Sequence, residues 1–169
     1  EEYQADIHAD RSIALQWSAG NGRLEVLKYL LSKGASITDI DSATVIWSAQ
    51  CGHLEVIKYL ASQGINLRCE EDGALIRSAD CGYLEVVKYL VEEHQADVCA
   101  QNGLALVSAA SWGHLEIVKY LVEHMGFNVI AFESGIYDLW KAQEDIKEGA
   151  NCKQVFRNSL FSMWGKRKE

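Results

Sequence analysis

The sequence predicts an all-α fold in which short helix pairs stack into a solenoid with short connecting fingers. One observation is a nine-residue string that begins at Gly22, Gly52, Gly82 and Gly113, a period of 30 or 31 residues. Another is a second recurring stretch before each glycine, which reads ALQWSAGN, TVIWSAQC, ALIRSADC and ALVSAASW. A single unit of this length cannot bury its own apolar face, so the units are expected to stack on one another.

The string after each glycine predicts the second helix of a unit. In the second copy, Leu54, Ile57 and Leu60 recur near helical spacing, and Val56 widens the apolar stripe. Each copy also has a glutamate in its first turn, where the helix dipole favours negative charge, and a lysine three residues later. The pattern indicates an amphipathic helix with one face toward a core.

The stretch before each glycine predicts the first helix, and the glycine predicts its end, because glycine readily adopts the left-handed backbone found there. Small residues in this helix let a neighbouring helix approach closely; they are Ser18-Ala19, Ser48-Ala49, Ser78-Ala79 and Ala109-Ala110. Trp17 and Trp47 directly precede two of these pairs. We expect both tryptophans to be mostly buried, as tryptophan usually is.

These strings resemble the repeats of the ankyrin family. GHLEVIKYLASQGIN and QADVCAQNG are similar to the second helix and finger of an ankyrin repeat, and the resemblance covers residues 1–131. The sequence departs from the family in two ways. IALQ, ATVI, GALI and LALV replace the usual TPLH, and each repeat is shorter than the usual length of about 33 residues. Short repeats of this kind are similar to divergent ankyrin arrays of large DNA viruses and their amoebal hosts.

Both ends of the chain depart from the regular period. Residues 1–7 align without a gap on residues 92–98, so we expect residue 1 to fall inside a partial repeat, as in a piece of a longer protein. Residues 132–169 are expected to form degenerate capping helices, at about 135–147 and 153–164, because Trp140 and Lys141 replace the small pair there. A terminal unit with a different outer face is what a solenoid requires.

Charge and composition exclude several classes of partner. The chain has 16 Lys and Arg against 24 Asp and Glu, a net charge of -8, and gains nothing from counterion release on nucleic acid. No apolar run approaches the roughly 20 residues of a membrane helix. The five cysteines lack paired close spacing, which suits a reducing compartment. We therefore expect an intracellular monomer, cytoplasmic (in the host cell if viral), with no nucleic-acid or membrane partner.

Four residues could suggest a chemical site, and their spacing argues against one. Cys51 and Cys81 stand at equivalent positions of neighbouring repeats, and stacked helices lie farther apart than a disulfide tolerates. We expect both to be small, half-buried thiols. His53 and His114 are two repeats apart, too far to share a metal ion, and are expected to be structural. The sequence thus predicts no enzymatic activity, no metal and no cofactor.

Two sets of positions predict a surface for a protein partner. The resemblance implies that the positions just before each glycine face the concave, binding side, where Trp112 would be an anchor if exposed. Residues 1–131 contain 18 acidic and 9 basic residues, and the finger carboxylates suit a partner with a basic segment, although a merely solvated surface has the same composition. The candidate contacts are Asn21, Asp39, Asp41, Gln50, Glu70, Asp72, Asp80, Ser111 and Trp112.

The resemblance implies a non-enzymatic module that binds a protein or peptide on its concave surface of first helices and fingers. An alternative is a targeting or substrate-recognition arm, such as that of a ubiquitin-ligase adaptor, whose working domain lies upstream of residue 1. A metal or redox module built on the five cysteines is a further alternative.

Overall fold

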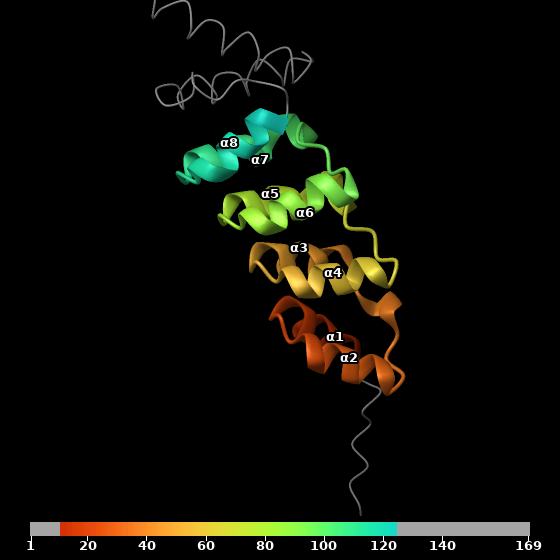
Figure 1. Cartoon of the computed structure of the whole chain (residues 1–169). Helices are drawn as coiled ribbons and strands as arrows, with labels where there is room; N and C mark the ends of the chain where they lie inside the picture. Colours follow the sequence, from red (N-terminus) through yellow and green to blue (C-terminus); the bar gives the residue numbers. More distant parts are fainter. Residues whose placement is uncertain (1–10, 125–169) are drawn as a thin grey trace, which may run out of the picture.

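The computed structural model describes residues 11–124, and all regular structure in that range is helical, which confirms the all-α fold class. The helices are α1 (Arg11–Gly20), α2 (Leu24–Ser32), α3 (Ser42–Gln50), α4 (Leu54–Ser62), α5 (Cys69–Asp80), α6 (Leu84–His94), α7 (Ala100–Ser111) and α8 (Leu115–His124), with a short 3-10 turn at Ile37–Asp39. Figure 1 shows these helices stacked as consecutive pairs, with the connecting fingers along one side of the stack. The partial repeat and the capping helices predicted at the two ends lie outside the described residues.

The first helices of neighbouring repeats pack more closely on one another than the second helices do. Contacts between neighbouring repeats are concentrated between α1 and α3, α3 and α5, and α5 and α7, whereas the second helices meet more sparsely. Small side chains make this approach possible, since Ala19, Ala49, Ala79 and Ala109 are each fully buried. The Ser48 hydroxyl also donates a 3.1 Å hydrogen bond to the carbonyl oxygen of Ala19 in the preceding repeat. The predicted role of the small pairs is confirmed.

Gly22, Gly52 and Gly82 are required by both their backbone and their surroundings, whereas the space around Gly113 is open. Gly52 has φ +74, and a methyl group at its α-carbon would lie 2.3 Å from the Tyr83 ring of the next repeat. The His53 ring lies in the same way over Gly22, and the His114 ring over Gly82. His53, Tyr83 and His114, each directly after a loop glycine, are therefore spacers between repeats, and the structure gives His53 and His114 the structural role expected of them.

The first helices begin in different ways, which the sequence pattern does not predict. Helix α3 starts regularly, with Asp41 as its N-cap. Helix α5 opens with a left-handed turn, because Glu70, Glu71 and Asp72 have φ of 51, 52 and 61. Left-handed backbone is unfavourable for residues that carry a β-carbon. The finger before α5 is therefore held in a conformation that its local sequence alone does not favour.

Trp17 corrects one expectation about the interior. Its side chain is 61% exposed, so the expected burial is wrong for Trp17. Trp47 lies over Gly20 of the preceding repeat, where an added methyl group would be 2.1 Å from its ring. Trp17 meets the Trp47 ring edge to face, with centroids 5.7 Å apart. Two tryptophans at the same position of the repeat thus have different surroundings.

Candidate partner-binding surface

The positions before each loop glycine lie at the C-terminal ends of the first helices. Stacking of the repeats brings them into one line, which we call the helix-end line. The side chains of Asn21, Gln50, Ser111 and Trp112 are exposed, and Asp80 is half-buried. The line is therefore carried by the helices that pack most closely between neighbouring repeats. Predicted site residues far apart in the sequence are thus placed on one surface.

Trp112 is the most exposed large apolar side chain of the described residues, at 69%. Its indole N–H donates a 2.9 Å hydrogen bond to Oδ1 of Asp80 in the preceding repeat. His114 also places a ring nitrogen 3.0 Å from the backbone oxygen of Asp80. The condition set in the sequence analysis is therefore met, because the Trp112 ring is exposed. One edge of the ring is bound to Asp80 through the indole N–H.

The finger carboxylates Asp39, Asp41 and Glu70 lie near the opposite ends of the first helices. Oδ1 of Asp41 accepts hydrogen bonds from the backbone N–H of Thr44 at 2.8 Å and from its hydroxyl at 2.6 Å. These bonds lower the pKa of Asp41. Glu70 accepts a hydrogen bond from the hydroxyl of Ser42 in the preceding repeat. Asp41 thus caps the backbone of α3, and Glu70 contacts a side chain of the preceding repeat. Asp39 forms no ion pair among the described residues.

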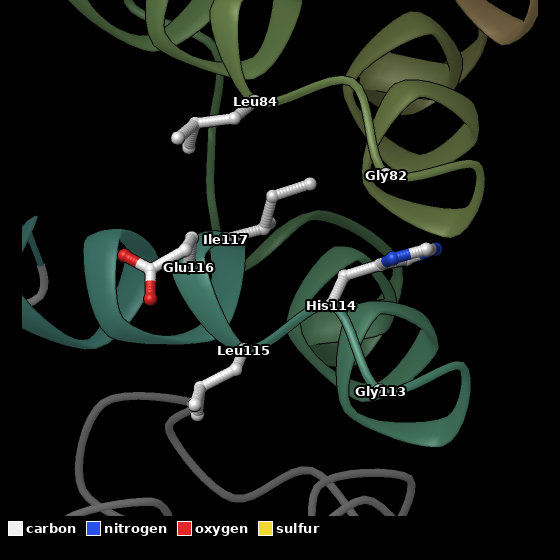
Figure 2. A pocket seen from close by; sticks show the side chains of 7 residues that line it. All are labelled: Gly82, Leu84, Gly113, His114, Leu115, Glu116 and Ile117. Carbon is white, nitrogen blue, oxygen red and sulfur yellow. The ribbon is translucent and has the colours of Figure 1, made fainter.

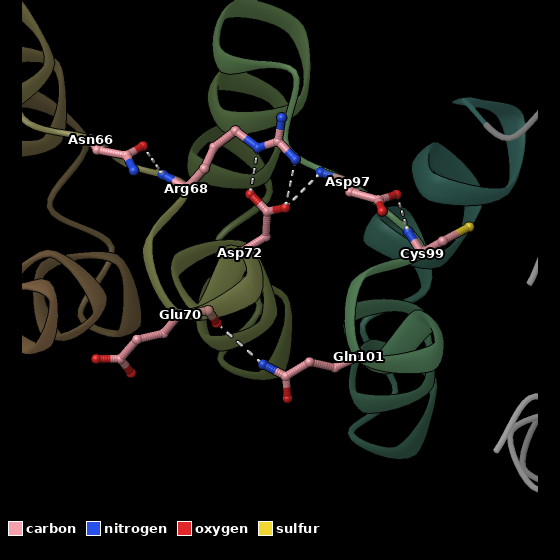
Figure 3. Close-up of polar contacts among 7 residues, drawn as sticks. All are labelled: Asn66, Arg68, Glu70, Asp72, Asp97, Cys99 and Gln101. Atoms are coloured by element: carbon pink, nitrogen blue, oxygen red, sulfur yellow. Dashed lines mark hydrogen bonds and ion pairs between the residues drawn. The ribbon is translucent and has the colours of Figure 1, made fainter.

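Asp72 is a correction, because its side chain is 4% exposed and cannot reach a partner. Its carboxylate accepts hydrogen bonds from Nε and Nη2 of Arg68 at 3.0 and 3.1 Å. It also accepts one from the backbone N–H of Asp97, in the next finger, at 3.0 Å (Figure 3). Asp72 therefore joins two successive fingers. The arginine four residues earlier was the available sequence signal for an internal ion pair.

The first-turn glutamate of each second helix is paired with a lysine, whereas the finger carboxylates, like Glu92, Glu93 and Glu123 at the ends of α6 and α8, form no ion pair among the described residues. In each second helix the lysine pairs with the glutamate three residues before it, at 3.0 to 3.3 Å. Within residues 11–124, by contrast, Asp39, Asp41, Glu70 and Glu71 form no ion pair. The fingers therefore carry carboxylates without ion pairs at the starts of the first helices, at the opposite end from the line.

A comparison with family models connects this geometry to known proteins. The model for ankyrin repeats (3 copies) matches residues 2–71 and 46–133, well over half of the chain. The chain belongs to the ankyrin repeat family. Ankyrin repeats generally mediate protein–protein interactions and are typically non-enzymatic. No curated protein sequence matches the chain.

One hollow opens on the loop side of this ankyrin array, between its third and fourth described repeats. It measures about 350 Å³ and lies between the Gly82 loop and the start of α8 (Figure 2). Leu84, Leu115 and Ile117 form its apolar wall, and His114 and Glu116 its polar side. His114 also packs on Gly82, so this side chain is part of the repeat junction.

The described residues of the ankyrin array were also considered for a metal site, a membrane-spanning helix and a reactive thiol. Over residues 11–124, no group of three or more His, Cys, Asp or Glu side chains could hold a metal ion. In the same range, no helix has the length and apolarity needed to cross a membrane. Cys51 is half-buried as expected, but Cys81 is exposed, which corrects that expectation. Burial raises the pKa of the Cys69 and Cys81 thiols, and this disfavours the reactive thiolate.

Proposed function

We propose that this ankyrin array is a non-enzymatic module that binds a protein or peptide across the helix-end line and the fingers. The observation that carries the proposal is Trp112, an exposed tryptophan at the end of that line whose indole N–H donates a hydrogen bond to Asp80. Tryptophan is enriched among the residues that dominate binding energy at interfaces. Fixing its orientation before binding reduces the entropy lost on association. The remaining contacts would come from Asn21, Gln50 and Ser111.

The charge of the fingers favours a partner with a basic segment. Asp39, Glu70 and Glu71 lie along the finger side without ion-pair partners among the described residues. Complementary charge of this kind mainly raises the association rate and selects between partners. Because added salt screens exposed charges, association should slow as ionic strength rises.

The same surface would serve a targeting arm of a larger protein, the alternative function considered above. Both functions require a partner on the helix-end line, so the experiment below tests what they share. Thiols at Cys51, Cys69 and Cys81 are compatible with a reducing compartment, and we place the encounter with the partner in the cytoplasm.

The test is affinity capture from cell lysate, read by mass spectrometry, with three chains compared. The finger variant carries Asp39→Lys and Glu71→Lys; Asp41, Glu70 and Asp72 are left intact because they cap α3, bind Ser42 of the preceding repeat and join the fingers. The control variant carries Glu55→Lys and Glu85→Lys, an equal change of charge on the second helices.

We expect the wild type and the control variant to retain a common partner and the finger variant to lose it. Thermal melts must first show that all three chains are folded. Equal capture by the finger variant would contradict a role for the finger charge, and loss from both variants would show that only net charge matters.

A further inference from the structure

Trp112 and Asp80 form a corner with two different chemical surfaces. The indole ring is 69% exposed, and its face carries the negative electrostatic potential of an aromatic π system. Its N–H is used by Oδ1 of Asp80, which places a carboxylate at the ring edge. The contact of the His114 ring with the backbone oxygen of Asp80 helps to position the Asp80 side of this corner. The corner is assembled by two repeats, with Asp80 from α5 and Trp112 directly after α7.

The second oxygen of Asp80 is poorly used within the described residues. Oδ2 forms an ion pair with Nη1 of Arg77 at 3.8 Å, which is too long for a hydrogen bond. The Arg77 side chain is 54% exposed, so this pair is screened by water and contributes little stability. A cation from outside could therefore replace Arg77 at Asp80 at small cost.

We propose that Trp112 and Asp80 form a subsite for an arginine side chain of the partner; this rests on the proposed function and names one contact within it. The guanidinium stacks on the Trp112 ring and donates to Oδ2 of Asp80, and Arg77 swings away. Arginine fits better than lysine because its planar group can stack and hydrogen-bond at the same time. The net charge of -8 favours approach of a cationic segment.

The probe for this subsite is hexa-arginine peptide, with hexa-citrulline as its matched neutral peptide and hexa-lysine as the second cation. Binding is followed on the full chain by the NMR signal of the Trp112 indole N–H, assigned with a Trp112→Phe variant. We expect hexa-arginine to shift this signal saturably, hexa-lysine to bind more weakly, and hexa-citrulline to leave it unchanged.

Variants then locate the contact. Trp112→Ala and Asp80→Asn should weaken hexa-arginine binding about three- to tenfold, the range of one exposed cation–π contact or screened charge contact. Arg77→Gln should tighten it, because a competing cation is removed. Trp17→Ala, Glu55→Gln and Lys33→Gln are the matched controls, with another exposed tryptophan and equal changes of charge away from the proposed surface, and should change the affinity less than twofold.

Two results would overturn the subsite. Control variants that change the affinity as much as the Trp112 and Asp80 variants would mean diffuse attraction by net charge. A Trp112 signal that responds equally to hexa-citrulline, or to none of the peptides, would mean that no cation is recognised there. Either result leaves the proposed function standing if the finger variant still loses its captured partner, so the two failures are distinguishable.

Discussion

Residues at equivalent positions of this array have different surroundings, and the tryptophans show why. Trp17 and Trp47 share one position in the repeat, yet only Trp47 lies over a glycine of a described preceding repeat. Periodicity assigns one environment to one position, whereas burial depends on which repeat lies next to it. Asp72 shows the same limit, because its burial depends on Arg68 and on a backbone N–H of the next finger.

His53 gives a pH dependence that can be tested. Burial lowers the pKa of His53 from its ordinary 6.5, and the nearby charge of Arg23 adds to this, against a hydrogen bond to the Gly20 backbone. The unfolded chain therefore binds this proton more readily than the folded chain does. The contribution is fully favourable above pH 6.5 and is lost as the pH falls below it.

We expect the free energy of unfolding to fall between pH 7.5 and 5.5, and to fall less steeply in a His53→Gln variant. Urea titrations at several pH values measure both slopes, and comparing slopes removes any constant cost of the substitution. An identical slope in the two chains would show that His53 does not contribute.

At the scale of elements, the helices were predictable and their starting turns were not. The four second helices follow directly from apolar spacing and from the Glu–Lys pairs, which form in each copy. The left-handed turn at the start of α5 has little signal in its sequence, since Glu70 and Glu71 ordinarily avoid positive φ, although Asp72 is of a residue type that adopts it more often. The contacts of Asp72 with Arg68 and with the next finger accompany that turn, and they come from tertiary structure.

Glu71 allows this strained turn to be tested alone. Its side chain is exposed and its φ is 52, so glycine should relieve the left-handed backbone there. Glu71→Gly is expected to stabilise the chain by about 1 kcal/mol. Glu85→Gly, in the ordinary first turn of α6, should instead destabilise it by about 1 kcal/mol.

Chemical denaturation of the two glycine variants beside the wild type provides the measurement. Opposite signs are the expected result. Destabilisation of similar size in both would mean that the backbone at Glu71 is not left-handed in solution.

For the whole molecule, the fold was predictable because one short signal recurs four times and each copy supports the others. The candidate surface was predictable in part. Asn21, Gln50, Ser111 and Trp112 are exposed on one line, as the repeat pattern predicts, whereas the acidic run at 70–72 contains one residue that is internal. Sequence shows that carboxylates are adjacent, but side-chain direction depends on how neighbouring fingers pack.

The role of Asp72 in joining repeats leads to a third prediction. Asp72→Ala removes the acceptor shared by Arg68 and the Asp97 N–H, and should destabilise the array by about 1.5–3 kcal/mol. Asp72→Asn keeps an acceptor and tolerates positive φ, so its cost should be smaller. Urea unfolding followed by circular dichroism measures both. Equal costs would show that charge, and not the acceptor geometry, holds the fingers.

The uneven contact between the two helix layers has a mechanical consequence. Repeats held closely at their first helices and sparsely at their second helices have one direction of low stiffness. A small rotation of one repeat about the first helices changes the distance between the second helices of adjacent repeats, and few contacts between those second helices are lost. If a partner binds as proposed, the sum of such rotations along the stack would let its curvature adapt to that partner without a hinge between two domains.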